Sequence, residues 1–275
     1  LNNQQPTGSI EGKILYLDLT DYTVTFWAKG WGEVFNFTDK WGLNEQKITI
    51  NPAWQEGVNC EMRYSPSDGQ TQYVTTTTYV ATRSEWKHYA ITRKGSKVTI
   101  YINGIVAGSK DLVGSFPIRE LHLMNDPAWQ TGNYPGGVAN LTIDELTVWN
   151  TPLDQTTIRD WMCKKITSEH PYECSNLVLY FNFDEGLGTV LEDKRGPSDV
   201  VLTNGFQWVA SGAAIGDESV YDYVTPQDIT MVHPDSDSLT ATRTSGVSNG
   251  IHLYRVDNMP PVTALVDNAA IVSMD

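Results

Sequence analysis

The sequence is poor in basic residues, poor in cysteine and without any long hydrophobic run. Its 275 residues include 19 Lys and Arg against 33 Asp and Glu, which gives a formal net charge of −14 at pH 7. Nucleic acids and anionic membrane surfaces attract basic proteins, so we expect neither as a partner. No apolar run has the length that spans a bilayer, and no signal peptide is visible at Leu1. Direct membrane insertion is therefore not expected.

The three cysteines do not follow a metal-binding pattern. Cys60, Cys163 and Cys174 contain no CxxC pair, and the five histidines are scattered along the chain. Cys163 and Cys174 bracket the short segment CKKITSEHPYEC, which a disulfide would close, and buried thiols are the alternative. Because the composition is otherwise typical of secreted proteins, we predict a disulfide between Cys163 and Cys174 and a thiol at Cys60.

Turn residues, by contrast, are abundant and divide the chain into short segments with the alternation of β-strands. Up to residue 150 these segments are KILYLDL, DYTVTFWAKG, EVFNFTD, QKITINP, TQYVTTTTYVA, IRELHLMN and LTIDELTVWN. Short strands at regular intervals favour an antiparallel sandwich over alternating strands and helices. One short helix is predicted within residues 151–166, where Ile158, Trp161, Met162 and Ile166 form an apolar stripe.

Residues 84–110, SEWKHYAITRKGSKVTIYINGIVAGSK, predict two hairpins in series. A turn that contains glycine is expected at residues 94–96. The second turn is expected at Asn103-Gly104, because both residues of such a turn need positive φ.

The position of the first turn determines which side chains face the core. A loop at residues 94–96 places Ala90 opposite Ile100 on the inward face. His88 shares that face, where a neutral imidazole hydrogen-bonded to the backbone is the ordinary outcome, so we expect a structural role. Tyr89 and Tyr101 would then pair on the outer face.

Several of these segments together resemble a known family. YTVTFWAKG, EWKHYAITRKGSKVTIYINGIVAGS, IRELHLMN and LTIDELTVWNTPLDQTTIRDWMC occur in the order found in laminin G-like domains of the concanavalin A-like lectin/glucanase superfamily. The resemblance covers roughly residues 10–165. It implies a two-sheet jelly roll in an extracytoplasmic location, as one part of a longer bacterial adhesin or polysaccharide-handling protein. LVLYFNFDEGLGTVLEDKRG and GIHLYRVDNMPP are similar to segments that accompany such domains.

The predicted fold is therefore all-β, with a two-sheet antiparallel jelly-roll sandwich and one short helix in residues 1–174. Residues 175–217 are expected to form a β extension and a connector rich in small residues near position 212. A fresh alternation in IHLYRV predicts a smaller, partial second β-sandwich module in residues 218–275, either truncated or completed by strands beyond the sequence.

The superfamily includes enzymes and binding modules, so fold does not decide function. Its glucanase branch carries paired carboxylates two and four residues apart on one strand, as nucleophile and acid/base. Here Asp144 and Glu145 are adjacent and should point to opposite faces of their strand, and Asp184 and Glu185 have the same spacing. The one GxSxG match, GVSNG at residues 246–250, falls in a predicted hairpin and not between a strand and a helix, so no nucleophile elbow is expected. We predict that the chain is not an enzyme.

Asp144 lies among apolar residues, so its carboxylate needs a partner. Backbone amides or Arg159 could serve. A calcium ion held by the carboxylate and loop carbonyls is the sharper hypothesis, and related domains sometimes bind one, although no DxDxDG loop is present. Ca²⁺ near Asp144 is thus the one candidate cofactor.

Four tryptophans fall in loops marked by glycine or proline: Trp31, Trp41, Trp54 and Trp129. Exposed indole rings offer flat apolar faces to pyranose rings or to a protein partner. The alternative is that the rings cap the open ends of the sandwich. We predict these four residues as the ligand-binding residues.

The favoured function is a non-catalytic binding or adhesion module of a secreted or cell-surface bacterial protein. It would bind a surface glycan or a protein partner and be joined to neighbouring domains of a longer chain. Two alternatives stay open. A structural spacer or docking module of a large surface assembly would show a flat apolar patch, and a polysaccharide-cleaving enzyme would show two carboxylates facing each other across a cleft.

Overall fold

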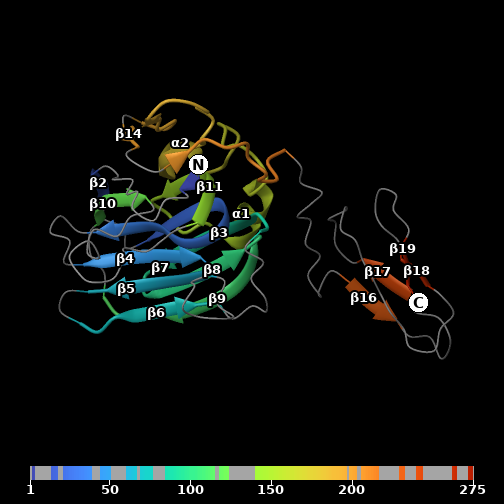
Figure 1. Cartoon of the computed structure of the whole chain (residues 1–275). Helices are drawn as coiled ribbons and strands as arrows, with labels where there is room; N and C mark the ends of the chain where they lie inside the picture. Colours follow the sequence, from blue (N-terminus) through green and yellow to red (C-terminus); the bar gives the residue numbers. More distant parts are fainter. Residues whose placement is uncertain are drawn as a thin grey trace. The chain divides into compact units, whose positions relative to one another are not determined.

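The computed structural model describes residues 2–3, 14–17, 21–38, 44–50, 60–66, 69–76, 84–114, 118–123, 140–196, 198–202, 206–216, 229–232, 240–243, 262–264 and 272–274. By their internal contacts the residues form two compact units, Leu1–Ala213 and Ala214–Asp275 (Figure 1). No helix in the described ranges is long and apolar enough to cross a membrane.

The first unit consists mainly of strands. They are β1 (Asn2–Asn3), β2 (Ile14–Leu17), β3 (Tyr22–Thr38), β4 (Glu45–Ile50), β5 (Cys60–Ser65), β6 (Gln72–Thr75), β7 (Lys87–Lys94), β8 (Lys97–Ile102), β9 (Ile105–Asp111), β10 (Ile118–Leu123), β11 (Asn140–Trp149), β12 (Leu177–Phe181), β13 (Val190–Leu191), β14 (Val200–Val201) and β15 (Phe206–Gln207). Two short helices, α1 (Gln155–Trp161) and α2 (Glu173–Asn176), lie between β11 and β12. In the second unit, β16 (Ile229–Val232) pairs with β17 (Thr240–Arg243), and β18 (Val262–Ala264) pairs with β19 (Val272–Met274).

The long strand β3 belongs to both sheets of the sandwich. Its first part pairs with β7 and β11 in sheet A, which continues through β8 to β9 and, on the other side, to β12, β1 and β15. Its second part pairs with β4 and β10 in sheet B, which ends at β6. Gly30 and Gly32, both at positive φ, lie where β3 passes from one sheet to the other. All pairings are antiparallel, so the predicted all-β sandwich is confirmed.

The main core lies between the two sheets and is rich in aromatic side chains. Phe26 of β3 stacks on Tyr89 of β7 with 5.3 Å between ring centroids, and Phe35 meets Phe26 edge-on at 5.7 Å. A smaller second cluster covers the outer face of sheet A. It consists of Ala90, Tyr101, Trp149, Leu153, Ile158, Leu177 and Tyr180, and residues 150–176 supply the covering layer. The sandwich thus buries both faces of part of sheet A.

The register predicted for the hairpin of β7 and β8 is wrong by one residue. Lys94 pairs with Lys97, so the turn contains only Gly95 and Ser96, and Ile91 lies opposite Ile100. A shift of one residue moves every side chain to the other face.

The corrected register reverses the expected faces. Tyr89 points into the main core, whereas Ala90 and Tyr101 lie in the outer cluster under α1. His88 also faces this side, edge-on to Trp27 at 5.5 Å, and burial lowers its pKa to about 3. Its expected structural role is consistent with this burial, but the face is not the predicted one.

The predicted disulfide between Cys163 and Cys174 is not formed. Cys163 follows α1 and is buried, whereas Cys174 lies on α2 and is exposed, where its Sγ contacts Glu173 Oε2 at 3.1 Å. The two sulfur atoms therefore lie in different environments. Cys60 is a buried thiol in the main core.

Thiol titration of the denatured, non-reduced chain should give three thiols, one from each cysteine. In the native state only Cys174 should react quickly, since burial protects Cys60 and Cys163 and raises the pKa of the Cys60 thiol. A count of one thiol after denaturation would show that Cys163 and Cys174 do form the disulfide.

Replacing Gly104 by Ala should destabilise the first unit by about 2 kcal/mol. Gly104 has φ of 74°, and a Cβ there would collide with Arg159 Cγ and approach Met162 Sδ to 3.3 Å. Gly196→Ala is the matched control, because its Cβ would lie 3.5 Å from Asp193 Oδ2, an ordinary contact. Thermal unfolding measures both variants, and equal transition temperatures would contradict the close approach of α1 to this turn.

Candidate functional site

A β-bulge in β11 interrupts the alternation of its side chains at Glu145. The register of β11 against β3 shifts between Asp144 and Thr147, and Glu145 has φ of 49°. Leu141 and Ile143 before the bulge and Leu146 and Val148 after it all lie in the main core. The extra residue therefore stays out of the core, and the expectation that Asp144 and Glu145 point to opposite faces is wrong. The charges of these two side chains interact directly.

Asp144 is held by two hydrogen bonds in a buried position. Its side chain accepts from the Ser211 hydroxyl and, at 2.9 Å, from the backbone N–H of Glu145. Burial raises the pKa of Asp144, while the hydrogen bond from Ser211 opposes the rise. Backbone amides were one of the partners expected for this carboxylate.

Among the carboxyl groups near the bulge, Glu145 has the most strongly shifted pKa. Only 6% of it is exposed, and Tyr180 of β12 donates a hydrogen bond to its Oε2. Burial raises the pKa of Glu145 to about 8; the Tyr180 bond lowers the pKa, and the neighbouring charge of Asp144 raises it further. At neutral pH this side chain is therefore mainly protonated.

Asp144, Glu145 and Asp184 form a cluster of carboxyl groups. This cluster reaches solvent at the ion pair of Lys165 with Asp184. These side chains are about half exposed, and Asn182 donates to the same Asp184 oxygen at 2.7 Å. The hydrogen bond to Asp184 raises the pKa of Lys165, and the charges of Glu145 and Asp144 act in the same direction. The carboxyl groups thus extend from an exposed ion pair to a buried protonated group.

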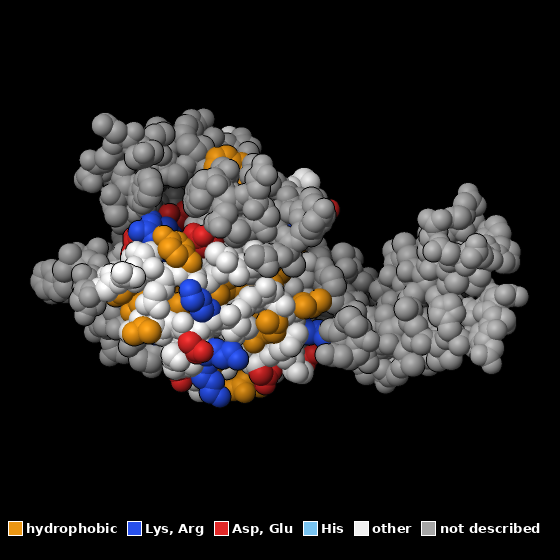
Figure 2. Space-filling view, turned by 90° about the horizontal axis from the view of Figure 1, so that it is seen from below, with side chains coloured by type: hydrophobic (Ala, Val, Ile, Leu, Met, Phe, Trp, Pro, Cys, Tyr) orange, Lys and Arg blue, Asp and Glu red, His pale blue; other side chains and the backbone are white. Residues whose placement is uncertain are grey.

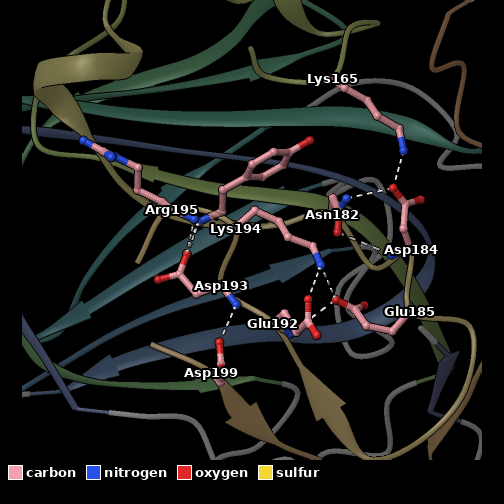
Figure 3. A network of polar contacts seen from close by, with 10 residues as sticks. Lys165, Asn182, Asp184, Glu185, Glu192, Asp193, Lys194, Arg195 and Asp199 are labelled. Carbon is pink, nitrogen blue, oxygen red and sulfur yellow. Dashed lines mark hydrogen bonds and ion pairs between the residues drawn. The ribbon is translucent and has the colours of Figure 1, made fainter. Parts of the chain in front are cut away.

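Residues 182–196, which follow β12, are here called the acidic loop. Hydrogen bonds and ion pairs connect its charged side chains to one another (Figure 3). Lys194 lies between Glu185, at 3.2 Å, and Glu192, at 2.7 Å. Asp193 accepts at 3.0 Å from the backbone N–H groups of Tyr180 and Arg195. These contacts connect the hairpin of β13 and β14 to β12 and account for the acidic residues of this loop as structural ones.

No group of three His, Cys, Asp and Glu side chains within the described ranges is arranged to hold a metal ion. Asp144, the expected calcium ligand, already accepts hydrogen bonds from Ser211 and from the Glu145 backbone. Calcium near Asp144 stays a prediction.

The outer side of sheet B carries a second candidate site, formed by polar side chains in cross-strand rows. We call it the polar face of sheet B. It consists of Glu33, Asn36 and Thr38 on β3, Glu45, Lys47 and Thr49 on β4, Glu61, Arg63 and Ser65 on β5, and Tyr73 and Thr75 on β6. The intervening positions, such as Phe35, Ile48, Met62 and Val74, face the main core.

Ion pairs connect the charged members of this face. Lys47 lies 3.5 Å from Glu33 and 3.6 Å from Glu45, and Arg63 lies 3.1 Å from Glu45. Glu61 is also buried, and this burial raises its pKa. The strands therefore hold these charges in fixed positions outside the main core.

One row of the polar face runs from a buried to an exposed end. Asn36 is fully buried and Lys47 is 5% exposed, whereas the Arg63 side chain is 29% exposed and Tyr73 is 44% exposed. Asn36 Oδ1 and Thr38 Oγ1 are buried without a hydrogen-bond partner among the described residues.

The predicted tryptophan site is only partly within the described residues. Trp31 lies on β3, not in a loop; it is half-buried and pairs with Asn140 of β11. Trp41, Trp54 and Trp129 lie outside the described residues. Sequence reasoning missed the polar face, although the polar residues at every second position of QKITI, EMRYS and QYVT could have indicated it.

These features define a β-sandwich protein with one face of a sheet lined by fixed polar side chains. Residues 6–159 match the family model of the concanavalin A-like lectin/glucanases superfamily, and the chain belongs to this family. Among curated proteins, none matches the chain significantly.

Solved structures share the fold at low sequence identity. A provisionally assigned carbohydrate-binding protein from Bacteroides ovatus is 18% identical with a TM-score of 0.54; the match covers 78% of this chain and 60% of that one. The chain thus spans less than two thirds of that protein. Domain 4 of AbnA, a GH43 extracellular arabinanase from Geobacillus stearothermophilus solved with arabinotriose, is 19% identical with a TM-score of 0.43, covering 57% and 74%. Domains LG4-5 of the mouse laminin alpha1 chain are 16% identical with a TM-score of 0.41, covering 56% and 41%.

Glu145→Gln should remove a loss of stability that sets in as the pH rises from 4.5 to about 8. Because the folded pKa of Glu145 is raised from 4.5 to about 8, its contribution to stability is fully present below pH 4.5 and is lost as the pH rises through about 8. A neutral amide can still accept from Tyr180, so the variant should gain about 2 kcal/mol relative to the native chain between pH 5 and pH 8.5.

Thermal unfolding across this pH range measures the difference between the two proteins. His88 and His170, whose pKa values are lowered by burial to about 3 and about 4, add a loss of stability below pH 6.5 that both proteins share. Glu169→Gln, which changes an exposed carboxyl, is the control. Parallel curves for the native chain and Glu145→Gln would show that Glu145 is ionised in the folded state.

Proposed function

We propose that the chain is a non-catalytic glycan-binding module of a secreted or cell-surface bacterial protein. The superfamily includes enzymes and binding modules, so the proposal rests on the site. The observation that carries it is the row of the polar face of sheet B that runs from buried Asn36 to exposed Tyr73. The assignment of the Bacteroides ovatus relative to carbohydrate binding agrees with it.

The exposed end of this row has the chemistry that sugars need. Tyr73 presents an aromatic ring on which the apolar face of a pyranose can stack. Beside it, Arg63 supplies donors and is oriented by Glu45 at 3.1 Å and by Ser65 Oγ at 3.0 Å. Deeper in the face, the buried carboxylate of Glu45 pairs with Lys47 and Arg63 and holds them in position. Because the strands fix these side chains, little conformational entropy is lost on binding.

The four tryptophans remain proposed contacts. Trp31 is half-buried on β3 at the junction of the two sheets. Trp41, Trp54 and Trp129 are proposed on their sequence context alone. Together with Tyr73 they give the module aromatic surfaces that hold a sugar by stacking, which needs no acid/base pair.

The carboxyl cluster of β11 supports a role without catalysis. Glycoside hydrolysis needs two carboxyls on opposite sides of the scissile bond. Asp144 accepts from Ser211, Glu145 accepts from Tyr180, and Asp184 is paired with Lys165. These contacts assign the cluster to the packing of β11 against β12 and the connector.

The docking alternative is less favoured on the side where β6 and β9 lie. Figure 2 shows this side, where hydrophobic side chains of the described residues are scattered among charged ones. The exposed large hydrophobic residues of the segments near these strands are Tyr73, Val106 and Val113. A flat, continuous apolar patch was the feature expected of a docking module.

Binding to a panel of immobilised polysaccharides and oligosaccharides tests the proposal. Tyr73→Ala and Arg63→Met should each weaken binding to the recognised glycan by about tenfold, through loss of stacking and of oriented donors. Leu187→Ala, which removes an apolar side chain that is 78% exposed on the acidic loop, should leave binding unchanged. The alanine variants of Trp31, Trp41, Trp54 and Trp129 belong to the same series.

Two results would contradict the proposal. Binding that is unaffected by Tyr73→Ala and Arg63→Met would show that the glycan does not bind to the polar face of sheet B. Release of reducing sugar from the panel, abolished by Asp144→Asn or Glu145→Gln, would make the chain an enzyme.

A further inference from the structure

The last described segment of the first unit, residues 206–213, is fixed to it at four separate places. We call this segment the latch. At its start, β15 pairs with β1, with Phe206 opposite Asn3 and Gln207 opposite Asn2. Strand β1 in turn pairs with β11, so the latch extends sheet A by one short strand. Its first anchor is thus strand β1.

The second anchor is formed by aromatic side chains. Phe206 and Trp208 are partly buried against the main core, and their rings meet edge-on at 6.2 Å. The Trp208 indole N–H donates to the Gly188 carbonyl at 2.9 Å. This bond connects the latch to the acidic loop.

The third anchor is the buried carboxyl of Asp144. Ser211 donates its hydroxyl hydrogen to Asp144 Oδ2, and the same hydroxyl oxygen accepts from Ala213 N–H at 3.1 Å. Hydrogen bonds to charged or buried acceptors are worth more than those between exposed neutral groups, and their loss is correspondingly costly. One serine therefore ties the end of the latch to the bulge of β11.

The fourth anchor is a close contact between Gly212 and Trp86. A Cβ on Gly212 would lie 2.7 Å from Trp86 Nε1 and 3.0 Å from Cδ1. Only glycine fits against the indole at this distance. Lys29 Nζ lies 5.4 Å from the centroid of the Trp86 ring, a cation–π contact.

We propose that residues 206–213 are a latch that opens without unfolding of the rest of the first unit. The first unit ends at Ala213. With the latch open, the eight residues from 206 to 213 leave the sandwich and can extend over about 27 Å.

The contrast between the anchors and the sheets explains why the latch opens first. Strands β1 and β15 contain two residues each, whereas β3 and β11 contain 17 and 10. Local opening draws on the segments with the fewest hydrogen bonds and the least buried surface. The latch is therefore expected to open before the strands of the sandwich separate.

Limited proteolysis and hydrogen exchange of the full chain test the latch. In the native chain, cleavage near the unit boundary should occur beyond residue 213. Ser211→Ala and Gly212→Val should each raise cleavage and amide exchange within residues 206–213 by about tenfold or more, while β3 and β11 stay far better protected than this segment in the native chain and in both variants. Ser175→Ala, at an exposed serine bonded to its neighbour Asn176, and Gly196→Ala are the matched controls.

Two outcomes would overturn the proposal. Variants that are cleaved within the latch no faster than the native chain would show that Ser211 and Gly212 do not hold it. Amide protection of residues 206–213 equal to that of β3 and β11 in the native chain would show that the segment unfolds only with the whole unit.

Discussion

The structure of the first unit depends on one strand that serves two sheets. The first part of β3 pairs with β7 and β11, and the second part pairs with β4 and β10. The change of sheet at Gly30 and Gly32 fixes both sheets to the same backbone, so the core between them is closed along this edge by covalent chain. The cluster of β11 and the polar face of sheet B are therefore held in fixed positions by a single element.

The order and type of the strands could be predicted from the sequence, because alternation and turn residues are local signals. The prediction failed in deciding which face of a strand points to the core. A hairpin loop of two residues in place of three moved Tyr89 into the core and His88 out of it. In β11, a bulge at Glu145 likewise changed which side chains face the core. The switch of core positions from Leu141 and Ile143 to Leu146 and Val148 is visible in the sequence, but the strand that it packs on is not.

The candidate sites show the same limit. Asp144 was singled out correctly as a carboxyl that needs a partner, yet its partner Ser211 lies 67 positions later and no spacing rule connects the two. The polar face combines residues of four strands, each of which contributes only two or three polar side chains. Rows of this kind depend on register, which is decided by tertiary packing and not by the segments themselves. The predicted disulfide failed because short spacing in sequence does not place two sulfur atoms in one environment.

The pairing of β1 with β15 has a consequence for how the chain is made. Strand β1 is the first described strand of the unit in chain order, and its partner β15 is the last. The central ladders of β3 with β7 and β11 can assemble earlier, but the edge of sheet A beside β11 is completed only after residue 207 has emerged. Contacts between such distant parts of a chain form slowly, since the intervening loop must first be closed. Until then, nascent chains carry an unpaired strand, and chaperones that bind extended segments would find it there.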